Sequence, residues 1–213
     1  MTHTISDMGS APHSVAIATT DGMLHFELAL AYEVFSHAPD AVQVPWYDVA
    51  ICGTQAVRAG LFGVDPDHGL DRLVRADTVI VPAVDDVDDT PADLVEAVRA
   101  AHESGARVVS LCTGAFVLAA AGLLDGLRAT THWAHTEELA ARYPRVQVDP
   151  DVLYVDNGSV LTSAGKAAAM DLCLYLVRRD HGSAIANVVA RRLVVPPHRA
   201  GGQAQFVTTP VPA

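Results

Sequence analysis

Short apolar runs and segments of helical periodicity alternate along the chain. Four runs rich in β-branched residues are typical of strands, and the segments between them carry apolar residues at helical spacing. This alternation predicts an α/β fold with a mostly parallel sheet and helices on both faces. The predicted strands are 14–19, 46–53, 78–83 and 107–111, and the predicted helices between them are 26–35 and 90–105.

A tight hairpin is predicted in the second half of the chain. Asn157-Gly158 supplies the two residues that such a turn requires, so residues 152–162 are expected to form two antiparallel strands. The remaining predicted elements are an exposed hairpin or loop at 60–69, helices at 115–121, 135–143, 167–179 and 184–193, and an irregular segment at 194–203.

Cys112 lies where a predicted strand changes into a predicted helix. A side chain at such a joint is held at the carboxyl end of the sheet, where the ligands of open α/β sheets bind. The helix N-terminus behind it favours a thiolate and provides amides for an oxyanion. The alternative is a buried structural cysteine, because free cysteine is among the most buried residue types. The local sequence leaves both interpretations open.

Composition narrows the class of protein. With 213 residues, half of them hydrophobic, the chain is long enough for one large α/β domain. It shows neither an apolar run of transmembrane length nor a signal peptide, so we expect a cytoplasmic protein without a membrane partner. Its 25 acidic residues against 14 Lys and Arg give a formal charge of -11, so we expect no nucleic-acid contact by this domain itself.

Metal and cofactor chemistry are not expected. The three cysteines are far apart and form no CxxC pair, which argues against a zinc site or a disulfide framework. His132 and His135 have no further ligand at the spacing of a zinc site. The chain also lacks a Walker loop and a GxGxxG motif. We therefore predict no metal and no cofactor.

Two residues are candidates for functional partners of Cys112. His132 ends the short extended segment that follows the Cys112 helix, and a histidine near a cysteine is the minimum set for an activated thiolate. A chance placement is the alternative, because the chain has ten histidines. Glu27 lies in the first turn of the helix 26–35, where the helix dipole alone accounts for a carboxylate.

Three motifs resemble those of a known superfamily. The stretch from Leu111-Cys-Thr-Gly to Arg-Ala-Thr-Thr-His-Trp133 is similar to the core of the PfpI/ThiJ superfamily, which shares its fold with class I glutamine amidotransferases. The segments Leu-Thr-Ser-Ala-Gly165 and Val-Val-Pro-Pro-His-Arg-Ala-Gly-Gly-Gln203 resemble GlxA-type AraC-family transcriptional regulators. Those regulators join a PfpI-like domain to a C-terminal helix-turn-helix domain. The resemblance implies a flavodoxin-like three-layer sandwich with a cysteine elbow at 14–207, a flexible arm at 1–13, and a tail or linker at 208–213.

The resemblance also implies roles for single residues. Cys112 corresponds to the elbow cysteine, and Glu27 to the acidic residue that reaches it from the first helix. A protonated Glu27 that donates to the Cys112 thiolate is expected to lower the pKa of the thiol. His132 corresponds to a histidine near the pocket, so Cys112, Glu27 and His132 are the catalytic candidates. The ligand-binding candidates are Thr113, Gly114, Gly165 and Lys166, the first two through backbone amides that hold an anion.

Three departures limit the transfer of an activity. PfpI-type proteases carry a histidine directly after the nucleophile, where this chain has Thr113, so a peptidase triad is not expected. Isonitrile hydratases share the Cys-Thr-Gly and Ala-Thr-Thr-His-Trp motifs but use an aspartate where this chain has Glu27. Lys166 stands where a small or hydroxylated residue is typical. It either faces the pocket, where it holds an anion or lowers the Cys112 pKa, or points outward as a helix-start lysine.

These features lead to three functional hypotheses. The first is the small-molecule-sensing and dimerising domain of a GlxA-type regulator, with the homodimer implied by the superfamily alone. The second is a cysteine-dependent enzyme, a hydratase, lyase or hydrolase of isonitrile hydratase-like, amidase-like or glyoxalase-like type, in which the Cys112 thiolate attacks an electrophilic carbon. The third is a redox sensor in which Cys112 is reversibly oxidised.

Overall fold

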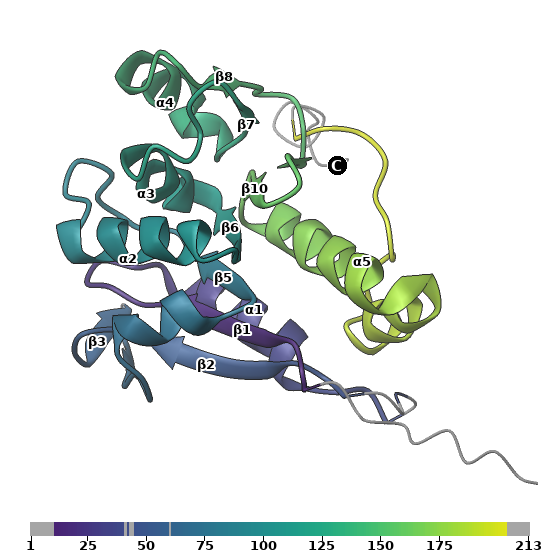
Figure 1. Ribbon diagram of the computed structural model, residues 1–213. Helices are drawn as coiled ribbons and strands as arrows, with labels where there is room; N and C mark the ends of the chain where they lie inside the picture. The colour runs from purple at the N-terminus through teal and green to yellow at the C-terminus, as the bar shows by residue number, and fades with distance from the viewer. Residues whose placement is uncertain (1–10, 41, 43–44, 60, 204–213) are drawn as a thin grey trace, which may run out of the picture.

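The computed structural model describes residues 11–40, 42, 45–59 and 61–203 (Figure 1). Its centre is a six-stranded sheet in the order β2-β1-β5-β6-β10-β9, parallel except for the edge strand β9. This confirms the predicted α/β class and mostly parallel sheet. The strands are β1 (Ser14–Ala18), β2 (Asp48–Cys52), β5 (Thr78–Val81), β6 (Arg107–Leu111), β9 (Tyr154–Asp156) and β10 (Val160–Ser163).

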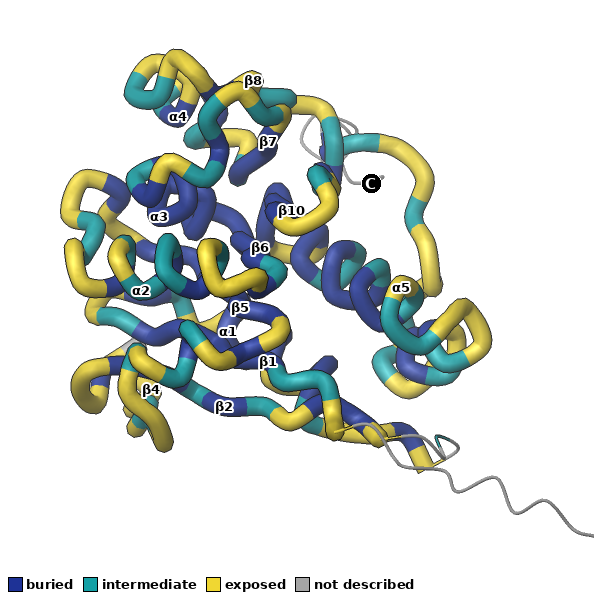
Figure 2. Tube along the Cα trace, viewed as in Figure 1, coloured by how far each residue is buried: buried dark blue, intermediate teal, exposed yellow. Residues whose placement is uncertain are grey.

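Helices cover both faces of the sheet and complete three layers, with the buried strands between them (Figure 2). Neighbouring residues of a strand point to opposite faces. Val15 and Ile17 of β1 therefore pack with α1 and α5, whereas Ala16 and Ala18 belong to the core that contains α2 and α3. The helices are α1 (His25–Ser36), α2 (Ala92–Glu103), α3 (Ala115–Ala120), α4 (Thr136–Arg142) and α5 (Ala167–Arg192).

Smaller elements surround the central sheet. β3 (Val57–Ala59) and β4 (Phe62–Val64) form an antiparallel pair that begins before the hairpin or loop predicted at 60–69 and overlaps it only in part. β7 (Arg128–Ala129) pairs in parallel with β8 (Gln147–Val148). Three short 3-10 helices are η1 (Leu70–Arg75), η2 (Cys112–Gly114) and η3 (Trp133–His135).

The second half of the chain has the predicted hairpin, but its last two predicted helices form one element. The hairpin at Asn157-Gly158 is confirmed as the antiparallel pair β9 and β10. The two helices predicted at 167–179 and 184–193 form the single element α5, interrupted at Gly182, whose φ of 84° is not helical. Within the described part of the chain no helix is long and apolar enough to cross a membrane. Most of the predicted arm and the whole predicted tail, residues 1–10 and 204–213, lie outside the described residues.

Candidate functional site

Cys112 occupies a strained turn at the carboxyl end of β6, between that strand and η2. Its φ is 56°, a value that residues with a side chain rarely adopt. Such strain persists only where the surroundings hold it, and it is most common at functional sites. Thr131 is one such support, because its hydroxyl donates to the Cys112 carbonyl at 2.9 Å. The predicted cysteine elbow is therefore present.

Two glycines allow the elbow to pack closely. Gly165 has a φ of 77° and lies directly on Cys112, so that a Cβ there would fall 2.1 Å from the Cys112 Cβ and 2.7 Å from its Sγ. A Cβ on Gly114 would fall 2.4 Å from the carbonyl oxygen of Val81 at the end of β5. A larger residue at either position has to displace the elbow or its neighbour.

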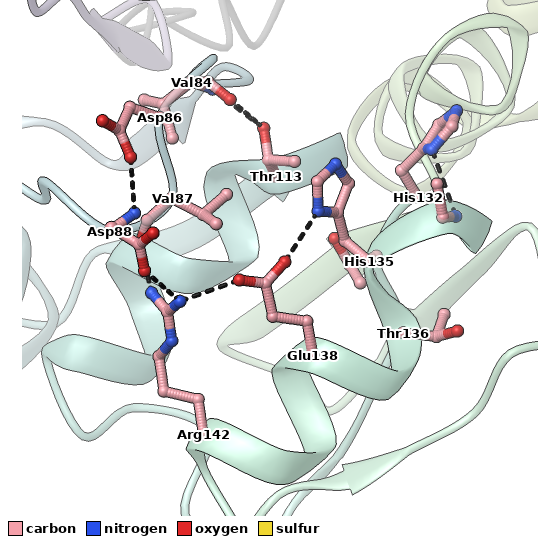
Figure 3. A network of polar contacts seen from close by, with 12 residues as sticks. Val84, Asp86, Val87, Asp88, Thr113, His132, His135, Thr136, Glu138 and Arg142 are labelled. Atoms are coloured by element: carbon pink, nitrogen blue, oxygen red, sulfur yellow. Dashed lines mark hydrogen bonds and ion pairs between the residues drawn. The ribbon is translucent and has the colours of Figure 1, made fainter.

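The Thr113 side chain is engaged within the fold. Its hydroxyl donates to the Val84 carbonyl at 2.6 Å and accepts from the Val84 N–H at 2.9 Å. Figure 3 shows Thr113 in contact with Val84. This pair of bonds ties η2 to the segment that follows β5. The backbone N–H of Thr113 lies beside the Cys112 sulfur, where it favours the thiolate. The predicted role of the Thr113 amide, to hold a ligand anion, stays a prediction.

The Cys112 thiol is buried, with 2% of the residue exposed. Burial, followed by the negative charge of Glu27, raises the pKa of this thiol from 9.0 to about 11, although Thr113 and Lys166 act in the opposite direction. The predicted lowering of the pKa is therefore wrong. The physical reason is that desolvation and the Glu27 charge outweigh the hydrogen bonds of Thr113 and the charge of Lys166.

Glu27 reaches the elbow from the first turn of α1, and its side chain is completely buried. Its Oε1 accepts from the Lys166 backbone N–H at 3.1 Å and lies 3.2 Å from Lys166 Nζ. Its Oε2 is also buried but has no hydrogen-bond partner among the described residues. Burying a polar atom without a partner is unfavourable, so this oxygen is suited to a proton or to a donor that a ligand brings.

Lys166 is the only lysine in the chain, and it also has a strained backbone, with φ 49° and ψ −132°. Its side chain is 49% exposed and contacts the buried Glu27 carboxylate, while Nζ lies 5.9 Å from the centre of the Phe26 ring. Of the two predicted orientations, the structure has the one in which Lys166 faces the site.

A pocket of about 530 Å³ opens beside the elbow, and we call it the elbow pocket. Three of the predicted site residues line it, namely His132, Gly165 and Lys166. Trp133, Leu153, Arg199 and Gln203 also contribute to its wall. Three of them, Trp133, Arg199 and Gln203, belong to the motifs that resemble those of the superfamily, but the motifs alone do not assign them to the site. The other predicted site residues, Cys112, Glu27, Thr113 and Gly114, are buried and do not line the pocket.

His132 is part of the pocket wall without a hydrogen bond to Cys112 among the described contacts. Its Nδ1 accepts from the Ala134 N–H at 3.4 Å. Burial, then the neighbouring His135 and Lys166, lower the pKa of His132 from 6.5, so its ring is neutral at pH 7. His135 contacts Glu138 at 3.0 Å on the other side of the turn (Figure 3). The described residues include no group of three or more His, Cys, Asp or Glu that could hold a metal ion.

The irregular segment 194–203 returns from α5 to form one wall of the elbow pocket, and we call it the strap (Figure 1, yellow). Arg199 fixes its middle through paired hydrogen bonds to the Asp171 carboxylate on α5, one of them 2.9 Å long. The end of the strap packs directly on the backbone of Asp151 at Gly202. A Cβ at this position would fall 1.5 Å from the Asp151 carbonyl oxygen, so only glycine fits there.

Gln203 connects the strap to the elbow. It is 6% exposed and donates to the Thr130 hydroxyl at 3.2 Å and to the Thr131 carbonyl at 3.3 Å. Thr131 in turn donates to the Cys112 carbonyl. A continuous series of hydrogen bonds therefore leads from the strap, which lines the pocket, to the strained cysteine beneath it.

These features define the class of protein. It is a three-layer α/β domain with a mostly parallel sheet, in which a buried glutamate from the first helix lies at a cysteine elbow. The chain belongs to the DJ-1/PfpI family, whose model matches residues 13–179. The family expected from the sequence motifs is thereby confirmed.

The individual relatives include regulators and an enzyme. The chain is 28% identical over 187 residues to the HTH-type transcriptional regulator GbdR of Pseudomonas aeruginosa, a match that covers 86% of this chain and 51% of that regulator. It is 30% identical over 175 residues to the isonitrile hydratase of Pseudomonas putida, covering 80% and 73% of the two chains. The chain spans about half the length of the first regulators it matches.

Solved structures show the same fold. The crystal structure of an AraC family transcriptional regulator from Pseudomonas putida matches with a TM-score of 0.76 at 21% identity, covering 85% of this chain and all of the other. Drosophila melanogaster DJ-1beta matches with a TM-score of 0.73 at 20% identity, covering 87% and 99%. At these identities the likeness concerns the fold alone.

Proposed function

We propose that this domain senses a small molecule in the elbow pocket and transmits its binding through the strap, as part of a transcriptional regulator. The observation that carries the proposal is the double role of the strap. Its residues Arg199 and Gln203 line the pocket, and Gln203 is hydrogen-bonded next to the elbow. In GlxA-type regulators a helix-turn-helix domain follows the PfpI-like domain, so a signal in the strap lies on the path to it.

Enzymatic catalysis by Cys112 is the second candidate. The strained elbow and the likeness to an isonitrile hydratase favour it. A nucleophilic cysteine must be a thiolate within reach of its substrate. With a pKa of about 11 and with Gly165 packed on its sulfur, Cys112 is a covered thiol at neutral pH. The same two properties argue against the redox-sensor hypothesis, because oxidation follows thiolate character and exposure.

We also propose that the domain acts in the cytoplasm as a homodimer, as the superfamily suggests. A second copy would cover the large apolar side chains that α1 and the β4 region expose, namely Phe26, Tyr32, Leu61 and Phe62. Sedimentation velocity on the wild type and on Phe62→Asp tests this assignment. We expect a wild-type dimer that Phe62→Asp converts to monomer, whereas a monomeric wild type would refute it.

Ligand screening on the full chain tests the sensing function. A metabolite library is screened by thermal shift against the wild type, Gly202→Ala and Gly63→Ala. The last variant is a matched control, because a Cβ at Gly63 meets no atom within 4 Å. We expect hits to stabilise the wild type and Gly63→Ala, and to bind Gly202→Ala at least about tenfold more weakly, because its strap is displaced.

Two results would contradict the sensing proposal. Equal affinity of a hit for the wild type and Gly202→Ala would show that the strap takes no part in binding. Turnover of a hit that Cys112→Ser abolishes, followed by NMR of the reaction mixture, would establish the enzyme instead.

A further inference from the structure

The charged side chains that line the elbow pocket have one sign. Lys166 and Arg199 line it, and none of its described lining residues is Asp or Glu. His132 adds a neutral imidazole at pH 7, because its pKa is lowered. Arg199 is paired with Asp171, whereas Lys166 makes one contact with Glu27 and is half exposed, so Lys166 is the positive group of this wall that can take a further negative partner.

Lys166 is the residue placed to hold a negative headgroup. Its exposed ammonium has three N–H donors, and the described contacts direct it towards Glu27 Oε1 at 3.2 Å. That contact and the strained backbone fix the side chain at the pocket wall instead of leaving it free in solvent. A fixed ammonium binds a carboxylate with less loss of side-chain entropy than a mobile one.

Apart from Gln203, the remainder of the wall is apolar or glycine. Trp133 and Leu153 line the elbow pocket, and an adjoining pocket of about 320 Å³ shares Ala167 and Arg199 with it. We call the second cavity the side pocket. Its apolar lining residues are Phe26, Leu30, Ala167, Met170, Val195 and Pro196.

One acidic residue, Asp171, lines the side pocket, and it does not reverse this preference. Its carboxylate is 8% exposed and accepts the paired hydrogen bonds of Arg199, so its charge is already compensated. The side pocket therefore offers hydrocarbon contact without an unpaired negative charge.

We propose that the two pockets together bind an amphipathic anion, a carboxylate on an unbranched aliphatic or aryl body. The carboxylate lies at Lys166, and the body extends past Ala167 into the side pocket between Phe26 and the strap residues Val195 and Pro196. This assignment rests on the proposed sensing function, because it takes the elbow pocket as the ligand site. It also explains how ligand binding would affect the strap, since the body of the ligand packs against Val195 and Pro196.

Three probes of equal chain length test the headgroup. Hexanoate, hexanamide and hexylamine are titrated into the full chain by calorimetry at pH 7.5. We expect hexanoate to bind at least about tenfold more tightly than hexanamide, and hexylamine to bind most weakly, because charge-assisted hydrogen bonds are the stronger ones. Lys166→Gln should abolish the preference for hexanoate. The matched control Arg191→Gln, which removes a charge that lines neither pocket, should retain it.

A second readout needs no variant. Reductive methylation with carbon-13 formaldehyde labels only the N-terminal amine and Lys166, since the chain has no other lysine. We expect hexanoate to shift the Lys166 signal in a saturable way with the calorimetric Kd, and hexanamide to shift it less. An unchanged Lys166 signal at saturating hexanoate would show binding elsewhere and overturn the proposal.

Failure of this proposal is distinguishable from failure of the sensing function. Equal affinities for hexanoate and hexanamide, or tighter binding of hexylamine, overturn the anion assignment even where metabolite hits still depend on the strap. If hexanoate behaves as expected but binds Gly202→Ala as tightly as the wild type, the anion site stands and the sensing function falls.

Discussion

The two ends of the central sheet each hold an ion pair, and the two pairs are built in opposite ways. At the amino end, Arg107 at the start of β6 makes two hydrogen bonds of 2.8 and 2.7 Å to Asp180 on α5, and Tyr47 donates to Asp180 at 2.9 Å. At the carboxyl end, the backbone N–H and the ammonium of Lys166 both contact Glu27 Oε1, and Glu27 Oε2 has no partner among the described residues.

The backbone differs between the two ends as well. Cys112 and Lys166 at the carboxyl end both have positive φ, whereas Arg107, Asp180 and Tyr47 do not. Buried polar atoms without a partner occur at both ends of the described chain, since Trp46 Nε1 and His181 Nε2 lie beside the amino-end pair. Of the two ion pairs, however, only the one at the carboxyl end combines backbone strain with an unpartnered carboxylate oxygen, which indicates selection for function there. The amino end, with its saturated ion pair, stabilises the fold. This division agrees with the rule that open α/β sheets bind ligands at the carboxyl ends of their strands.

Breaking the amino-end pair should have the largest effect on stability. Asp180→Asn leaves the Arg107 charge buried without a compensating carboxylate and should lower the free energy of unfolding by about 3–5 kcal/mol, measured by urea denaturation. Asp71→Asn, at the exposed ion pair with Arg75, is the control and should cost about 1 kcal/mol or less. Equal costs would contradict the special role of the amino end. Ligand affinity of folded Asp180→Asn should remain unchanged.

At the carboxyl end, the stability should depend on how closely Gly165 packs against Cys112 and not on an ion pair. Gly165→Ala places a Cβ inside the Cys112 side chain and should cost about 2–4 kcal/mol. Gly158→Ala is the matched control, because Gly158 has a similar positive φ of 86° but no atom within 4 Å of a Cβ. It should cost about 1 kcal/mol. If both variants lose the same stability, the packing of Gly165 on the elbow is not a constraint.

Alkaline pH should weaken the fold through Cys112. The pKa of this thiol is raised to about 11 in the folded protein, so the neutral thiol stabilises the fold below pH 9, and this contribution is lost as pH rises from about 9 to 11. Two pKa units correspond to roughly 2–3 kcal/mol. Denaturation at pH 8 and pH 11 should therefore show a smaller loss in Cys112→Ser than in the wild type. An identical loss in both proteins would mean that the thiol is not desolvated.

Removing the Glu27 charge should have the smallest effect of these changes. It should alter the reactivity of the Cys112 thiol. Because that charge raises the pKa of Cys112, Glu27→Gln should lower it and speed alkylation of Cys112 by about tenfold at pH 8. Glu33→Gln on the exposed face of α1 is the control and should leave the rate unchanged. Iodoacetamide kinetics followed by peptide mass spectrometry give both rates. Slower alkylation in Glu27→Gln would indicate that a protonated Glu27 donates to the thiolate.

The sequence predicted what depends on local pattern. Strand and helix periodicity located the elements of the sheet, Asn157-Gly158 located the hairpin, and the motif around Cys112 located the elbow. Gly182 was correctly placed between two helical segments, although they form one element.

Local sequence patterns do not predict contacts between residues that are far apart in the chain. Glu27 and Lys166 meet across 139 positions, Arg107 and Asp180 across 73, and the register that joins them is set by the whole sheet. The direction of the Cys112 pKa depends on burial, which the elbow motif does not reveal. The motif ending in Gln203 indicates the resemblance to the regulators, but only the return of the strap to Thr130 explains the position of Gln203 in the site.

Hydrogen–deuterium exchange of the strap tests the central claim most directly. Backbone amides of residues 194–203 are followed in the wild type and in Gly202→Ala, with and without a saturating ligand from the screen. We predict that the ligand slows exchange across the strap in the wild type, because the strap forms the pocket wall, and has little effect in Gly202→Ala. Exchange that stays unchanged in the wild type at full occupancy would contradict coupling between the elbow pocket and the strap.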